Sequence, residues 1–170
     1  EEVLDFAKGK AAAVARQHPA SVVIGGDTMI LLGKEKIGKP DGADEARRML
    51  CSLAGKTHRI FTSVAIIDGG GPGFATVAEV SVKMRHYSEA DVERYLMHGE
   101  SLDKAGAYSI QGEGRTLIES ISGDYLAAVG LPLRPIATYL SSRGVQFSPD
   151  VERIYSQRAF ANWSTFCSAE

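Results

Sequence analysis

Near the start of the chain stands the stretch Ser21-Val22-Val23-Ile24-Gly25-Gly26-Asp27-Thr28. Its first part, Ser21 to Gly25, predicts a short buried strand, because β-branched residues are enriched in strands. The glycines let the backbone turn and let a ligand approach closely. Asp27 is therefore expected two residues past a buried strand, at the carboxyl end where α/β folds gather their binding sites.

Asp27 is the residue of this stretch that is best suited to chemistry. A carboxylate at a strand end can hold Mg²⁺ or Mn²⁺, which prefer hard oxygen ligands, or it can orient and deprotonate a water molecule. An aspartate in a turn can also cap its own backbone. The local pattern leaves both interpretations open.

Outward from this strand, the hydrophobic periodicity predicts an alternation of helices and strands. Helices are expected over residues 2–17, 43–54, 89–98 and 132–144, with a weaker amphipathic helix over 149–161. Ser88 and Asp91 predict a capping box at the third of these. Strands are expected over 59–67 and 74–86, joined by a loop at 68–73, with short β segments at 108–110 and 116–118. A turn is expected at Gly33-Lys34, after the apolar residues up to Leu32. This order predicts an α/β fold with a mixed β-sheet sandwiched by helices.

Length and composition are those of one globular domain. The chain has 170 residues, of which 44% are hydrophobic and 24% charged, which is enough to build a core. The net charge of −2 gives no overall positive field for nucleic acid, so local lysines must meet any anionic ligand. No apolar run approaches the ~20 residues of a membrane span. Cys51 and Cys167 predict reduced thiols in a cytoplasmic protein, with a disulfide as the alternative.

Two further stretches carry residues suited to a nucleotide. In Lys39-Pro40 the proline fixes the backbone, so the lysine can present its ammonium group to a phosphate; a solvated surface lysine is the alternative. The small residues around Gln111 allow close ligand approach, and its amide has the donor and acceptor needed to read a nucleobase edge; a glycine-rich β corner is the alternative.

The glycines at 69–73 lack a following Gly-Lys-Ser/Thr and predict a hairpin tip. The four histidines lack metal-ligand spacing. Solvated or capping roles are expected for all four, and a position facing a ligand pocket is the alternative for His58, which follows Thr57.

Taken together, the sequence resembles the Maf family, the nucleoside triphosphate pyrophosphatases linked to septum formation. The matching motifs agree in order and spacing: Phe6-Ala7-Lys8-Gly9-Lys10-Ala11, Ile24-Gly25-Gly26-Asp27-Thr28, Gly38-Lys39-Pro40, Leu53-Ala54-Gly55-Lys56-Thr57-His58, Asp103-Lys104-Ala105-Gly106-Ala107-Tyr108-Ser109-Ile110-Gln111-Gly112, Ile121-Ser122-Gly123-Asp124-Tyr125 and Val129-Gly130-Leu131-Pro132-Leu133. The resemblance implies a Maf- and ITPase-like α/β/α domain over residues 1–144, followed by a C-terminal helical extension over 145–170.

The resemblance also implies an activity and a set of site residues. Family members split nucleoside triphosphates between the α and β phosphates, releasing a monophosphate and pyrophosphate, and are often dimers. Asp27 resembles the catalytic carboxylate and metal ligand, with Mg²⁺, Mn²⁺ or Co²⁺ as cofactor. The substrate-binding positions are Lys10 and Lys39, on the phosphate side, Thr28 and Gln111, which discriminate the base, and Lys104. We expect Asp27 to face Lys10, Lys39 and Gln111. The Asp-Thr and Ile-Gln-Gly motifs are similar to the branch that prefers dTTP and UTP over the branch acting on 7-methyl-GTP.

One part of the family pattern has no counterpart here. The family opens with a strand followed by Ser-x-Ser-Pro-Arg-Arg and has an acidic residue before its first helix, whereas the only Ser-Pro pair of this chain is Ser148-Pro149. We expect that about the first 35–40 residues, a strand–loop unit with its linker, are missing from this sequence, because a sheet without that strand would expose unpaired backbone. The alternatives are a catalytically impaired nucleotide-binding regulator of cell division or septation, and a relative that acts on purine triphosphates such as ITP.

Overall fold

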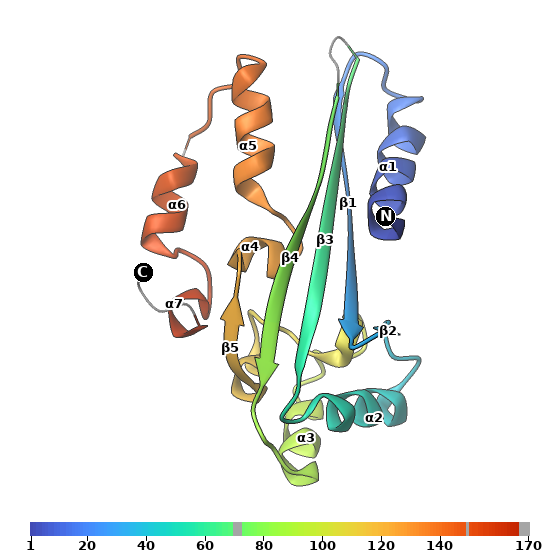
Figure 1. The fold of residues 1–170 in the computed structure, drawn as a ribbon, viewed down its shortest axis with the longest axis vertical. Helices are drawn as coiled ribbons and strands as arrows, with labels where there is room; N and C mark the ends of the chain where they lie inside the picture. Colours follow the sequence, from blue (N-terminus) through green and yellow to red (C-terminus); the bar gives the residue numbers. More distant parts are fainter. Residues whose placement is uncertain (70–72, 149, 167–170) are drawn as a thin grey trace. The chain divides into compact units, whose positions relative to one another are not determined.

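The computed structural model describes residues 1–69, 73–148 and 150–166. Helices alternate with the strands of a five-stranded sheet ordered β2-β1-β3-β4-β5 (Figure 1). The strands are β1 (Val22–Leu32), β2 (Glu35–Ile37), β3 (Thr57–Asp68), β4 (Phe74–Met84) and β5 (Ile118–Ser122). The pairs β1–β2 and β4–β5 are antiparallel. The predicted α/β fold is confirmed.

Four helices begin and end close to the predicted residues: α1 (Glu2–Ala15), α2 (Ala43–Leu53), α3 (Glu89–Leu96) and α5 (Leu133–Ser142). The predicted helix over 149–161 is present as the shorter α6 (Val151–Gln157), whereas α4 (Tyr125–Val129) and α7 (Trp163–Phe166) were not predicted. The capping box is confirmed, because Asp91 N–H donates to Ser88 Oγ while Ser88 N–H donates to the Asp91 carboxylate. None of the helices in the described part of the chain is long and apolar enough to cross a membrane.

Of the two short β segments predicted, the one at 108–110 is wrong, and the one at 116–118 coincides with β5 only at Ile118. A short 3₁₀ helix (Ala105–Ala107) precedes residues 108–110, and a second (Glu113–Leu117) leads into β5. Gly106 and Ala107 have φ values of 74° and 61°, a left-handed backbone that ends any extended segment at this point. Two predictions fall outside the described residues: the loop tip at 70–72 and the state of Cys167. Cys51 is an exposed free thiol.

The chain forms two compact units, which are described separately. Unit 1 comprises Glu1–Thr28, Phe61–Glu79 and Leu126–Arg158, and unit 2 comprises Met29–Ile60, Val80–Tyr125 and Ala159–Glu170. The long strands β1, β3 and β4 each contribute a segment to both units. The predicted extension, residues 145–170, is divided: its residues up to Arg158 belong to unit 1 and the rest to unit 2.

In unit 1, helix α1 lies closely against strand β1. Ala7 and Ala11 of the helix form a buried cluster with Val23 of β1 and Ala65 of β3. At Gly25 a Cβ atom would lie 2.5 Å from the Ala7 carbonyl oxygen and 2.7 Å from the Ala11 nitrogen. Gly25 therefore serves helix packing and not a turn.

This packing corrects the predicted position of Asp27. Neither Gly25 nor Gly26 has a positive φ, and β1 continues through them to Leu32. Asp27 thus lies in the middle of a strand and not past its carboxyl end. The predicted turn after Leu32 is confirmed, with Gly33 at a φ of 62° between β1 and β2.

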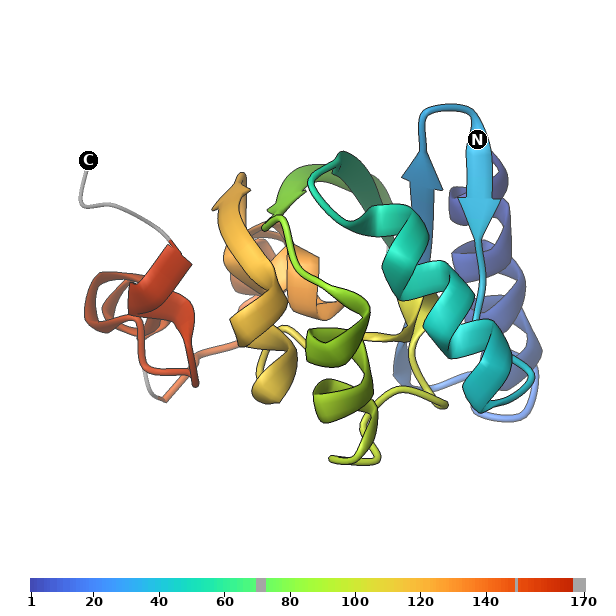
Figure 2. The same ribbon diagram turned by 90° about the horizontal axis from the view of Figure 1, so that it is seen from below.

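In unit 2, helices α2 and α3 pack side by side (Figure 2). The Tyr87 hydroxyl donates to the Leu50 carbonyl oxygen at 2.7 Å, which ties the residues before α3 to α2. Around these helices lies a core of fully buried side chains from both helices and from β4 and β5, among them Leu50, Leu53, Val82, Met84, Val92 and Ile118.

Candidate functional site

In unit 1 the structure brings Lys10 and Asp27 into direct contact. Lys10 Nζ donates to Asp27 Oδ1 at 2.6 Å and to the Gly26 carbonyl oxygen at 3.2 Å. Lys10 follows Ala7 by three residues, so it lies on the side of α1 that faces β1. The Asp27 side chain is 21% exposed and that of Lys10 is 58% exposed. A largely covered carboxylate is therefore paired with an ammonium group that a ligand can still reach.

Two buried hydroxyl side chains hold the strand around Asp27. Ser63 Oγ lies 2.6 Å from the Val3 carbonyl oxygen and 3.3 Å from that of Asp27. It thereby connects the first turn of α1 with the strand backbone at the candidate carboxylate. Ser63 and Thr62 are both buried. Neither residue was predicted from the sequence, although hydroxyl residues at the centre of an apolar β run indicate buried hydrogen bonds.

The hydrogen bonds of Thr62 define how Thr28 can act. The Thr62 hydroxyl donates to the Ala127 carbonyl oxygen at 2.8 Å, and its oxygen lies 3.1 Å from Thr28 Oγ1. Because the Thr62 hydrogen is used on Ala127, the Thr28 hydroxyl is the donor in the second contact. Thr28 Oγ1 keeps its lone pairs as acceptors for a ligand.

In unit 2, Lys104 contacts the Asp103 carboxylate, and the loop of Lys39 lies nearby. Gly106 N–H donates to the Gly38 carbonyl oxygen at 3.0 Å, which places the loop of Lys39 against the residues after Lys104. Lys104 Nζ lies 2.9 and 3.0 Å from the two Asp103 oxygens. Its hydrogen bond and charge, with a smaller contribution from Lys39, lower the pKa of the Asp103 carboxyl. Lys39 is thus close enough to act on the charge of Asp103, a residue that was given no role by the sequence.

Buried aromatic side chains support the loop that follows. His58 Nε2 and Tyr108 Oη are 2.7 Å apart. Burial lowers the pKa of His58 to about 4 and raises that of Tyr108 well above its ordinary value, so both are neutral at pH 7. His58 Nδ1 has no partner among the described residues. The solvated or capping role expected for His58 is wrong, because the residue is only 1% exposed and its partner is the buried Tyr108, 50 residues away in the sequence.

Gln111 lies at the exposed end of this loop. The preceding Ser109 is buried and donates its N–H to Tyr95 Oη at 3.0 Å. Gly112 N–H in turn donates to Ser109 Oγ at 3.1 Å. The Gln111 side chain is exposed, and it makes no hydrogen bond to a described residue. Lys10, Asp27 and Thr28 thus belong to unit 1, and Lys39, Lys104 and Gln111 to unit 2; that Asp27 faces Lys39 and Gln111 stays a prediction.

The residues present fit a metal ion only in part. No group of three or more His, Cys, Asp or Glu side chains occurs among the described residues, and Asp27 Oδ1 already contacts Lys10. Mg²⁺, however, is often held by one or two carboxylates and completed by water and substrate phosphates. Asp27 therefore fits a cation that arrives with a polyphosphate, and not a closed protein cage.

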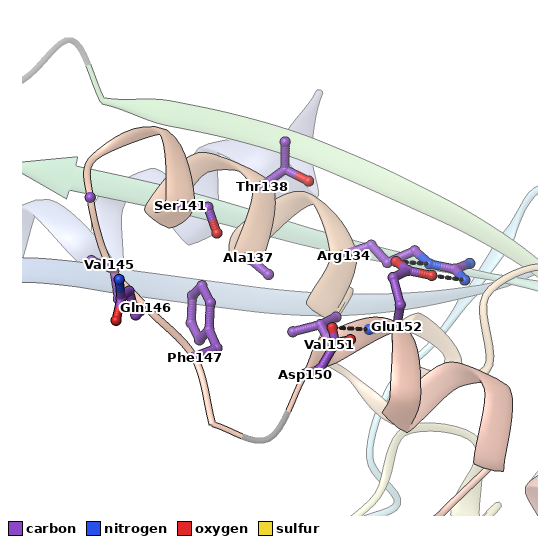
Figure 3. Close-up of a pocket in the computed structure, with 11 residues that line it drawn as sticks. Arg134, Ala137, Thr138, Ser141, Val145, Gln146, Phe147, Asp150, Val151 and Glu152 are labelled. Carbon is purple, nitrogen blue, oxygen red and sulfur yellow. Dashed lines mark hydrogen bonds and ion pairs between the residues drawn. The ribbon is translucent and has the colours of Figure 1, made fainter.

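Unit 1 also contains a hollow of about 860 Å³ beside α5 and the residues that lead into α6 (Figure 3). Along it, Arg134 makes two hydrogen bonds to the Glu152 carboxylate, at 3.0 and 3.1 Å. None of the six candidate residues lines this hollow. Its size alone gives it no role in the chemistry.

Comparison with known proteins adds to this geometry. Residues 1–143 match the family model described as Maf-like protein. The chain is 43% identical over 132 residues to the dTTP/UTP pyrophosphatase of Dictyoglomus thermophilum, a match that covers 77% of this chain and 68% of the relative. It is 43% identical over 141 residues to that of Moorella thermoacetica (82% and 73% covered) and 40% identical over 136 residues to that of Pyrococcus horikoshii (80% and 73% covered). Helices α6 and α7 lie beyond the matched region.

Proposed function

Because the chain belongs to the Maf family, we propose that it is a nucleoside triphosphate pyrophosphatase that acts on dTTP and UTP. The relatives at 40–43% identity bear the name dTTP/UTP pyrophosphatase. The single observation that carries the proposal is the contact of Lys10 with Asp27, which joins a carboxylate suited to base chemistry with a cation suited to a phosphate.

The proposed reaction is hydrolysis of the bond between the α- and β-phosphates. Asp27 orients a water molecule and accepts its proton as the oxygen attacks the α-phosphorus. The bond from this phosphorus to the bridging oxygen breaks, and pyrophosphate leaves with the electron pair. When bound at Asp27, a divalent cation such as Mg²⁺, Mn²⁺ or Co²⁺ supplies positive charge that polarises the phosphate oxygens.

The lysines stabilise the charge that this step develops. Lys10 balances Asp27 before substrate binds, and its exposed ammonium then contacts a phosphate oxygen. Lys39 and Lys104, which share the neighbourhood of Asp103, bind the phosphates of the leaving pyrophosphate. Positioned ammonium groups lower the barrier because they meet charge that grows in the transition state.

Gln111 and Thr28 discriminate the base in this proposal. Uracil and thymine present a ring N–H flanked by two carbonyl oxygens. The amide of Gln111 can accept from that N–H and donate to a neighbouring carbonyl oxygen. The Thr28 oxygen, with its hydrogen directed to Thr62, offers a second acceptor for the same ring N–H.

We also propose a cytoplasmic location and a homodimer. The cytoplasmic location is supported by the low cysteine content, two in 170 residues, and the dimer by what the family resemblance implies. Size-exclusion chromatography with light scattering tests the second point directly.

The function is tested by measuring pyrophosphate release from dTTP, UTP, CTP, GTP and ITP with Mg²⁺, Mn²⁺ or Co²⁺. We expect dTTP and UTP to be the best substrates and EDTA to stop turnover. In Asp27→Asn we expect kcat to fall by about 100-fold or more, the usual scale for loss of a general base. A matched control is Asp68→Asn, which alters another aspartate of unit 1 that accepts from Arg143 at 2.8 Å.

Each outcome separates the candidate functions. Asp27→Asn at the parental rate would contradict the role of Asp27. Saturable UTP binding without product would favour the regulator that has lost turnover. ITP as the best substrate would favour the purine-specific relative.

A further inference from the structure

Residues 159–166, here called the tail, contact the loop of residues 108–112, which contains Gln111, within unit 2. Asn162 Nδ2 donates to the Ile110 carbonyl oxygen at 3.0 Å and to the Gly112 carbonyl oxygen at 3.1 Å. These two residues flank Gln111. One amide group from the tail therefore holds the backbone on both sides of the residue proposed to read the base.

Aromatic packing keeps the tail in place. Trp163 is only 4% exposed, and its ring stacks on that of Tyr125, with centroids 5.1 Å apart and planes 13° apart. The Tyr125 hydroxyl donates to the Ala161 carbonyl oxygen. Phe166 is 6% exposed. Asn162 thus stands between two anchored neighbours and has little freedom to leave the loop.

The backbone of Asn162 is also specialised. Its φ of 65° lies in the left-handed region, which asparagine tolerates better than most residues other than glycine. This conformation turns the chain between Ala161 and α7. An alanine here would add backbone strain, so the contact is better tested with glycine or aspartate.

The protein therefore holds the backbone around Gln111 and leaves its side chain exposed. Ile110 and Gly112 are held by Asn162, and Ser109 is held by Tyr95. A side chain that must discriminate similar bases needs a fixed backbone, because a displacement of about 1 Å weakens a directional hydrogen bond.

We propose that Asn162 is a positioning residue that sets base selectivity by holding Gln111 toward the edge of a pyrimidine triphosphate. The proposal rests on the function proposed above. It assigns a role to a segment that lies outside the region matching the family model, which ends at residue 143.

The test compares Asn162→Gly, Asn162→Asp and Gln111→Ala in the full chain. Glycine keeps the left-handed backbone without the amide, and aspartate keeps the size of the side chain without donors. We expect the ratio of kcat/KM for UTP to that for ITP to fall roughly fivefold in both Asn162 variants, the scale of one or two lost hydrogen bonds. The change should lie in KM for UTP, with kcat near the parental value. Ser164→Ala, at an exposed position of α7, is the matched control and should leave the ratio unchanged.

Fluorescence shows whether the tail stays docked. Trp163 is the sole tryptophan of the chain, so its emission maximum should match the parental value in both Asn162 variants. A parental UTP-to-ITP ratio in both variants, together with an altered ratio in Gln111→Ala, would overturn the role of Asn162 and leave the proposed function standing. An unchanged ratio in Gln111→Ala would overturn base reading by Gln111 and this inference with it. Absence of turnover in the parental protein would instead refute the proposed function.

Discussion

The Lys10–Asp27 pair of unit 1 and the Gln111 loop of unit 2 are built in opposite ways. The pair consists of two charged groups, one of them 58% exposed. The loop is supported by neutral groups, namely the buried Tyr108 and His58 and the carbonyl oxygens that Asn162 contacts. Either charged group of the Lys10–Asp27 pair can exchange its partner for a ligand. The neutral groups around Gln111 can only fix the conformation of the loop.

The difference follows from what each region must do. An exposed ion pair contributes little stability of its own, because water and ions screen it, so it can be opened by a phosphate at little cost. Buried neutral hydrogen bonds are costly to break without replacement. A loop held by them keeps one conformation. Charge chemistry and base discrimination thus make opposite demands on the surrounding packing.

The largest expected effect comes from Gly25→Ala, which separates Lys10 from Asp27 by disturbing the packing of α1 against β1. In Gly25→Ala the new Cβ would meet backbone atoms of Ala7 and Ala11 at 2.5–2.7 Å, so α1 must move away from β1. We expect the free energy of unfolding to fall by at least about 3 kcal/mol, at the upper end of overpacking costs, and activity to fall with it. Urea unfolding and pyrophosphate release measure the two effects.

The control for this change lies on the same helix. Gly9 of α1 has nothing within 4 Å of its would-be Cβ, so Gly9→Ala should stabilise the protein by about 0.5–1 kcal/mol, as expected for a helix interior. Equal stability of the two variants would mean that α1 does not require close contact at Gly25.

The next effect concerns the pH dependence of stability that comes from the neutral, buried His58. Burial lowers the pKa of His58 to about 4 from an ordinary 6.5. As pH falls through 6.5, His58 becomes protonated in the unfolded chain but stays neutral in the folded protein. The stability due to neutral His58 is therefore complete above pH 6.5 and is lost between pH 6.5 and 4. The shift corresponds to about 3 kcal/mol as an upper value.

His58→Gln isolates this contribution. We expect the parental protein to lose up to about 3 kcal/mol more than the variant between pH 6.5 and 4, measured by urea unfolding at each pH. His98→Gln, at an exposed position, should keep the parental pH dependence. If His58→Gln shows the parental loss as well, His58 is not the group that titrates on unfolding.

Features set by neighbouring residues were predictable from the sequence. The capping box of Ser88 and Asp91 spans three residues, and the turn at Gly33 joins adjacent strands. The contact of Lys10 with Asp27, expected from the family resemblance, is present. Local patterns and motif spacing are sufficient for features of this kind.

Features set by distant residues were not predictable in the same way. From the sequence, Gly25 and Gly26 predict a turn. In the structure, Gly25 is required because α1 occupies the space beside it. His58 finds its partner 50 residues away, and the partners of Asn162 are 50 and 52 residues away. In each case the side chain type is clear from the sequence, but its environment depends on tertiary packing.

The smallest of these effects is expected for Lys10→Gln. This variant tests whether the exposed Lys10 ammonium acts on the substrate phosphate or on Asp27. We expect kcat/KM of Lys10→Gln to fall roughly 10- to 100-fold, the scale of a lost charged hydrogen bond of about 1.5–3 kcal/mol. If Lys10 binds the phosphate, KM for UTP rises and carries most of the change. If Lys10 acts mainly on the charge of the transition state, directly or by orienting Asp27, kcat falls while KM stays near the parental value. Lys8→Gln, two residues away and also exposed on α1, should leave both constants unchanged. An equal loss in Lys8→Gln would mean that the total positive charge of the helix matters and the contact with Asp27 does not.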